Sequence, residues 1–100
     1  RHEEAICAIE NAITHDPENA LYHQHKAQSL SFLGRHKQAL AELDVAVQWM
    51  PSSADLHFAR AREYQSLGQG KDASAAVQEV LKIDSLHAQA RGLLRELDAA

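Results

Sequence analysis

Apolar residues recur along the chain at spacings of three, four and seven residues, which is the spacing that forms one face of an α-helix. One such face comprises Ala20, Ala27, Leu30 and Leu33. A second, between about Arg35 and Trp49, comprises Ala39, Leu43, Ala46 and Val47. Gly34 ends the first helix because glycine readily adopts the left-handed C-terminal cap, and Pro51 ends the second because proline disfavours helix in the preceding residue. The pattern therefore predicts a pair of helices joined by a short turn.

The helix pair repeats with a period of 34 residues, since Ala20 recurs as Ala54 and Ala88, and Leu33-Gly34 recurs as Leu67-Gly68. This periodicity predicts one repeat domain over residues 1–100. We assign residues 1–19 to the second helix of a partial repeat, 20–53 and 54–87 to two full repeats, and 88–100 to a terminal capping helix. Ser53 is expected to cap the helix that follows it, and Ser85 is a candidate cap for the last helix.

The repeated residues resemble those of the tetratricopeptide repeat family. In one full unit the matching residues are Ala27, Leu30, Leu33-Gly34, Ala39, Leu43, Ala46 and Pro51. In the next they are Ala61, Tyr64, Leu67-Gly68, Ala73, Val77 and Val80. The resemblance implies an all-α fold, a right-handed α-solenoid of antiparallel helix pairs with about six helices. It also implies that Ala27, Ala61, Ala39 and Ala73 are buried where helices cross.

The chain departs from the family pattern at several positions. His23 and His57 stand where the family often has Trp or Leu, and Arg95 replaces the close-packing Ala of the last helix. That helix is expected to be a polar-faced cap. The first helix lacks a partner helix before it, so Ile6, Ile9 and Ile13 are expected to be partly uncovered and to offer a surface for homo-oligomerisation.

Charge and composition narrow the classes of partner. The net charge is −4, with acids and bases interspersed, which argues against a nucleic-acid surface. No apolar run is long enough for membrane insertion. Cys7 has no partner for an intrachain disulfide, which favours a reducing, cytoplasmic location, and we expect it to be a small packing residue. Because the chain begins at Arg1 and not Met, we expect it to be a piece of a longer protein.

The candidate catalytic and metal-binding chemistry is weak. Seven histidines are present, but they lack a Cys cluster or an HExxH pattern, and two pairs of them recur simply with the repeat. Gly68-Gln69-Gly70 is a turn sequence and not a phosphate-binding loop. We therefore expect no cofactor, no metal and no enzymatic activity.

The family resemblance implies that the first helix of each unit lines a concave groove that binds a protein or peptide. The candidate groove residues are Leu21, Gln24, Gln28, Ser31, Phe58, Arg62, Gln65, Gln89 and Glu96. Two alternatives remain, namely self-association and a regulatory arm of a larger enzyme. Trp49 is expected to pack under the following unit, the alternative being an exposed contact residue.

Some members of the family grip the terminal carboxylate of chaperone tails with Lys, Asn and Arg side chains. None of the residues at the matching positions here is cationic: Gln24, Gln28, Ala59, Gln89 and Leu93. Binding of chaperone tails is therefore not expected.

Overall fold

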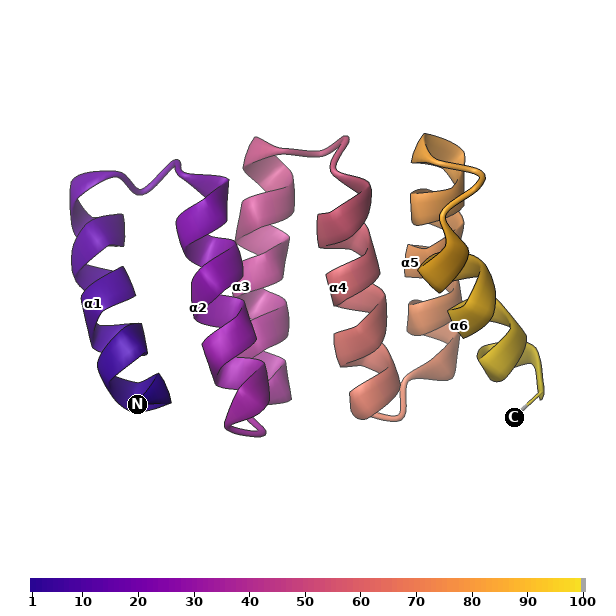
Figure 1. The fold of residues 1–100 in the computed structure, drawn as a ribbon, viewed down its shortest axis with the longest axis horizontal. Helices are drawn as coiled ribbons and strands as arrows, with labels where there is room; N and C mark the ends of the chain where they lie inside the picture. Colours follow the sequence, from indigo (N-terminus) through magenta and orange to yellow (C-terminus); the bar gives the residue numbers. More distant parts are fainter. Residues whose placement is uncertain (100) are drawn as a thin grey trace. The chain divides into compact units, whose positions relative to one another are not determined.

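The computed structural model describes residues 1–99, and these form an all-α fold without strands. Within residues 1–51, and likewise within residues 52–99, successive helices run antiparallel and are joined by short turns (Figure 1). Their bounds are α1 His2–His15, α2 Ala20–Phe32, α3 His36–Trp49, α4 Ala54–Ser66, α5 Gly70–Ile83 and α6 Ala88–Ala99. The predicted helix pairs are confirmed, with ends within about two residues of those expected from the sequence.

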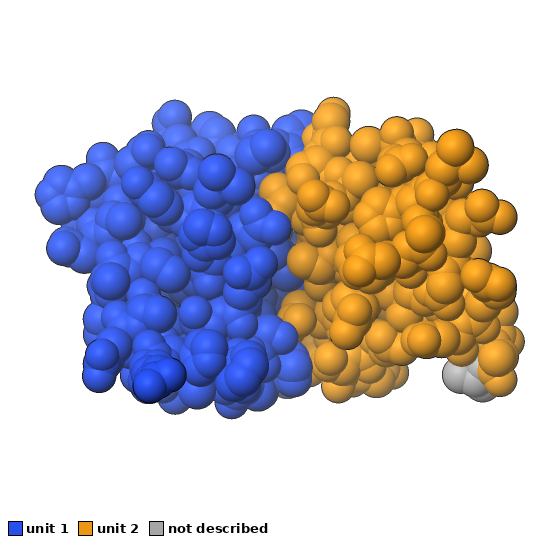
Figure 2. Space-filling view, in the orientation of Figure 1, with its two compact units in different colours: residues 1–51 blue, residues 52–100 orange. Residues whose placement is uncertain are grey.

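The helices form two compact units, which Figure 2 shows in blue and orange. Unit 1 runs from Arg1 to Pro51 and contains α1, α2 and α3, with α2 packed against both of the others. Unit 2 begins at Ser52 and contains α4, α5 and α6, with α5 packed against both neighbours. The core of unit 2 comprises Ala61, Ala76, Val77, Val80, Ala90 and Leu93.

Alanines are among the most deeply buried residues of the helices. Ala27, Ala39, Ala61 and Ala73 are all buried, the last three completely. Because alanine is the smallest residue that favours helix, it allows two helices to approach without a break in either. The predicted burial of these four residues is confirmed.

Glycines end the first helix of each pair, as predicted. Gly34 and Gly68 have φ angles of 79° and 74°, in the left-handed region that disfavours residues with a Cβ atom. The amide that follows Gly34, that of Arg35, donates to the carbonyl of Leu30 at 2.8 Å, which satisfies a carbonyl left free at the helix end. Gln69 and Tyr64 repeat this bond in unit 2 at 2.9 Å.

The N-terminal caps of α2, α4 and α6 are Asn19, Ser53 and His87, which are 34 residues apart. Asn19 Oδ1 accepts from the amide of Leu21 at 3.0 Å, and Ser53 Oγ accepts from that of Leu56 at 3.4 Å. His87 Nδ1 occupies the third cap position and accepts from the amide of Ala90 at 3.1 Å. Ser53 is confirmed as a cap, whereas the assignment of Ser85 is wrong because α6 begins at Ala88, too far along for Ser85 to reach its free amides.

Three further expectations are corrected. Trp49 was expected to pack under the following unit, but it is 48% exposed. Cys7 is exposed on α1 and not a packing residue. Ile6 is buried, because α2 packs on α1 and covers it, whereas Ile9 and Ile13 are only half-buried. Homo-oligomerisation through α1 stays a prediction. No helix within residues 1–99 combines the length and apolar character needed to cross a membrane.

Candidate functional site

A groove of about 280 Å³ lies between α4 and α6 in unit 2. Residues spaced by three or four positions on each helix line it, because such residues share one helix face. Five of the nine candidate binding residues are among them, namely Phe58, Arg62, Gln65, Gln89 and Glu96. Gly92 and Leu93 complete the lining. The structure therefore places side chains from two separate stretches of sequence in one groove.

An aromatic and a cationic side chain lie together in this groove. The Arg62 guanidinium is 5.9 Å from the centre of the Phe58 ring, within the range of a cation–π contact. The Phe58 ring lies 5.2 Å from the imidazole of His87, at a tilt of 37°. Phe58 also packs against the core of unit 2, so the ring that lines the groove is held from behind.

The opposite end of the groove is polar. Gln65 Nε2 on α4 donates to Glu96 Oε2 on α6 at 3.3 Å. This bond uses one Glu96 oxygen, while the carboxylate is exposed. The groove thus runs from an aromatic surface near the helix N-termini to an amide and carboxylate near the C-termini.

The other four candidate residues lie on α2 in unit 1. Leu21 and Gln28 are exposed, and Gln24 and Ser31 are half-buried. Their spacing places them along one side of α2, but they belong to the other compact unit. The structure therefore gathers the candidates into two separate sets and defines a groove around the set in unit 2.

Sequence reasoning missed Gly92 and His87 at this site, and it named Leu93 only as a position that provides no cation for a terminal carboxylate. His87 stands in the same 34-residue column as Asn19 and Ser53, and this signal was sufficient to identify it as a cap. Gly92 has the column mates Gln24 and Phe58, both named as groove residues, so the register alone also places it in the groove.

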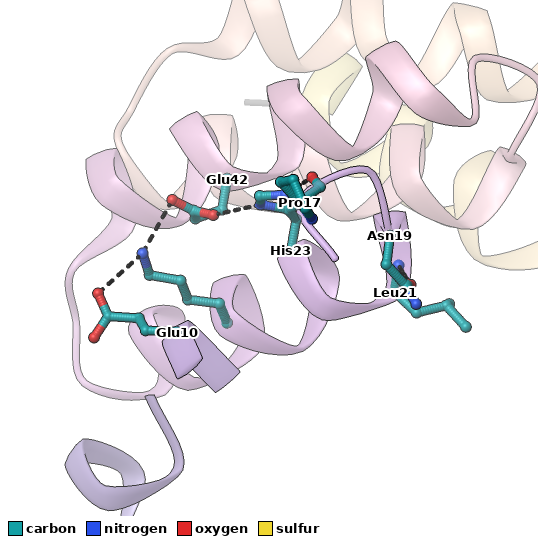
Figure 3. A network of polar contacts seen from close by, with 7 residues as sticks. Glu10, Pro17, Asn19, Leu21, His23 and Glu42 are labelled. Atoms are coloured by element: carbon teal, nitrogen blue, oxygen red, sulfur yellow. Dashed lines mark hydrogen bonds and ion pairs between the residues drawn. The ribbon is translucent and has the colours of Figure 1, made fainter. Parts of the chain in front are cut away.

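A network of polar contacts joins all three helices of unit 1 (Figure 3). The ring of His23, which is 7% exposed, lies with Nδ1 2.9 Å from Glu42 Oε1 and Nε2 2.8 Å from the carbonyl oxygen of Pro17. Lys26 Nζ lies 3.3 Å from Glu42 Oε2 and 3.4 Å from Glu10 Oε2. His23 therefore has a structural role in joining α2 to α3 and to the turn before α2.

A second groove, of about 390 Å³, lies over this network. Its lining includes Glu3, Glu10, Lys26, Arg35 and Glu42. These charges pair with one another, Lys26 with Glu10 and Glu42, and Arg35 with Glu3. A ligand would have to break these pairs, so this groove is a weaker candidate despite its volume.

Within residues 1–99, no group of three or more His, Cys, Asp or Glu side chains is placed to hold a metal ion. The polar groups of the α4–α6 groove are an arginine, two amides and one carboxylate, which suit the recognition of a polypeptide by hydrogen bonds and charge.

Comparison with known proteins relates the chain to one family. A model of the tetratricopeptide repeat matches residues 33–97. No match is found among curated protein sequences.

Solved structures show the same fold. The first tetratricopeptide repeat domain of Spaghetti (RPAP3), solved with the HSP90 peptide SRMEEVD, matches with a TM-score of 0.91 and 20% identity. The match covers 98% of this chain and 80% of the RPAP3 chain. The tetratricopeptide repeat domain of Arabidopsis OM64 matches with a TM-score of 0.92 and 20% identity, over 98% of this chain and 81% of the OM64 chain. PcrH, in complex with the chaperone binding region of PopD, has a TM-score of 0.90 and 18% identity, covering 98% and 79%. The chain belongs to the tetratricopeptide repeat family.

Proposed function

We propose that the chain is a protein-interaction scaffold that binds a segment of a partner protein in the groove between α4 and α6. The observation that carries the proposal is the convergence of Phe58, Arg62, Gln65, Gln89 and Glu96 on one groove. Aromatic and arginine side chains are the residues that most often dominate binding energy at protein interfaces. The two glutamines can both donate to and accept from the backbone of an extended segment.

The dimensions of the groove favour a polypeptide over a small molecule. At about 280 Å³ it is at or below the lower limit of typical small-molecule pockets, which are about 300–1,000 Å³. A groove of this size accommodates one or two side chains of a longer segment, with the remainder of the segment lying along the helices.

Related structures support binding of this kind. RPAP3 is bound to an HSP90 peptide and PcrH to a region of PopD. The ligand of this chain is not a chaperone tail, because the chain has no cation at the positions that would hold a terminal carboxylate. These positions are Gln24, Gln28, Ala59, Gln89 and Leu93. The chain therefore shares with those proteins the binding of a polypeptide segment and differs from them in its partner.

A pull-down tests the proposal by comparing the partner proteins that the immobilised wild-type chain and its variants retain. Arg62→Ala removes an exposed groove cation, and Lys82→Ala is a matched control that removes an exposed cation from α5. We expect quantitative mass spectrometry to find partners that wild type and Lys82→Ala retain and Arg62→Ala loses. Retention by Arg62→Ala of every partner that wild type retains would contradict the assignment of the groove.

A further inference from the structure

Gly92 is a glycine that the fold does not require. It lies inside α6, and its φ angle is not positive. A Cβ atom added there would meet no other atom within 4 Å. Glycine inside a helix costs about 1 kcal/mol relative to alanine, so neither backbone geometry nor packing favours glycine at this position.

The open space beside Gly92 is part of the α4–α6 groove. Gly92 lines the groove together with Phe58 and Leu93. It occupies the position in α6 that Phe58 occupies in α4, 34 residues earlier. The α4 wall of the groove thus carries a large aromatic ring at the position where the α6 wall carries no side chain. The missing side chain leaves room over Leu93, which a larger residue at position 92 would fill.

The two charged side chains of the groove, Arg62 and Glu96, differ in whether another side chain binds them. Within the described part of unit 2, residues 52–99, no carboxylate pairs with the Arg62 guanidinium, which is exposed. Arg62 is also the sole cation among the groove-lining residues given above. The Glu96 carboxylate lies one turn further along, where Gln65 binds it. A single acidic group on a partner is attracted by Arg62, whereas a second one is repelled by Glu96.

We infer that Gly92 determines specificity, by admitting a bulky apolar side chain of the partner segment between Phe58 and α6, with an acidic partner residue beside it facing Arg62. The inference rests on the proposed function. One cation and one carboxylate match an internal segment with a single acid better than a chain end, which adds a terminal carboxylate. The partner chemistry is thus a leucine-like or aromatic residue next to one Asp or Glu.

Gly92→Leu is the sharpest variant, because it fills the groove without endangering the fold. Leucine favours helix more than glycine does, and the space it enters is open. Ala88→Leu is the matched control, since it places the same side chain on an exposed position of α6 outside the groove. Circular dichroism and thermal melts of both variants verify that the helices are retained.

The probe is a phage-displayed library of short random peptides, selected on the immobilised chain. Peptides that bind wild type but not the Phe58→Ala/Arg62→Ala double variant are groove-dependent. We expect these to share a bulky apolar residue adjacent to an acidic one, to lose at least about tenfold in affinity for Gly92→Leu, and to bind Ala88→Leu as they bind wild type. We expect selection on Arg62→Glu to abolish the preference for the acid.

The outcomes separate the inference from the proposed function. Groove-dependent peptides that lack the apolar–acidic pair, or that bind Gly92→Leu as tightly as wild type, would overturn the role of Gly92 and leave the groove as the binding site. If no recovered peptide depended on Phe58 and Arg62, the proposed function would fail and the inference with it.

Discussion

His23 and Glu42 form a part-buried contact between α2 and α3, with His23 Nδ1 2.9 Å from Glu42 Oε1. The other ring nitrogen lies 2.8 Å from the carbonyl oxygen of Pro17, which is also an acceptor. Both nitrogens of the ring therefore have an oxygen acceptor within hydrogen-bond distance. The second Glu42 oxygen binds Lys26 at 3.3 Å, so one carboxylate connects two basic side chains of α2 to α3.

Glu42→Ala is predicted to destabilise unit 1 by about 1–3 kcal/mol, because it leaves a buried ring nitrogen of His23 without its partner and leaves the Lys26 ammonium with Glu10 alone. Glu42→Gln, which retains one oxygen acceptor, should cost less. The control is Glu79→Ala, since the exposed pair of Glu79 with Lys82 contributes less than about 1 kcal/mol. Urea denaturation measures the differences, and equal stabilities for Glu42→Ala and Glu79→Ala would refute the role of the network.

His87→Ala is predicted to lower the free energy of unfolding by about 1 kcal/mol, because it removes the acceptor that caps the amide of Ala90. His87→Asn and His87→Ser should retain most of the stability, since Asn19 and Ser53 cap the equivalent helices. Thermal melts by circular dichroism compare the three variants. A loss as large in His87→Ser as in His87→Ala would indicate that ring packing on Phe58, and not the cap, is the main contribution of His87.

Ala61→Leu is predicted to destabilise unit 2 by about 1–3 kcal/mol, because Ala61 is fully buried in its core and has no room for a larger side chain. Ala75→Leu on α5 adds the same atoms at an exposed position and should change stability by less than about 0.5 kcal/mol. Denaturant titration gives both values. A melt of Ala61→Leu that matched wild type would show that the repeat register is wrong.

The chain is predicted not to bind the peptide SRMEEVD, with which RPAP3 has been solved, because the positions that grip a terminal carboxylate hold Gln24, Gln28, Ala59, Gln89 and Leu93. Isothermal titration calorimetry at concentrations suited to micromolar binding measures this directly. A saturable heat with one peptide per chain would refute the prediction.

The 34-residue period was sufficient to place the helices, the buried alanines and the glycine turns, because each is a local requirement repeated in register. Ala27 and Ala61 must be small, and Gly34 and Gly68 must adopt positive φ, wherever the helix pair occurs. The same register placed Phe58, Arg62 and Gln65 on one face of α4, and the structure adds that α6 lies opposite this face.

Ser85 matched the residue preference for caps, but the 34-residue column of Asn19 and Ser53 points to His87, whose Nδ1 accepts from the amide of Ala90. Other differences depend on contacts specific to one position. Trp49 was expected to pack under the following unit, but it lies at the end of α3 and is half-exposed. The register places Gly92 in the same column as Gln24 and Phe58, but only the structure shows the open space beside it.

The central claim is that the α4–α6 groove is the binding site. The most direct test takes a partner segment recovered with the wild-type chain and titrates it against Phe58→Ala, Arg62→Ala and the α5 control Lys82→Ala. Arg62→Ala is the more informative variant, because Phe58 also packs against the core and requires a check of the fold by circular dichroism. We predict that each groove variant weakens binding by about 1 kcal/mol or more and that Lys82→Ala does not. Unchanged affinity in both groove variants, with binding lost in the α5 control, would contradict the assignment and move the site to another face.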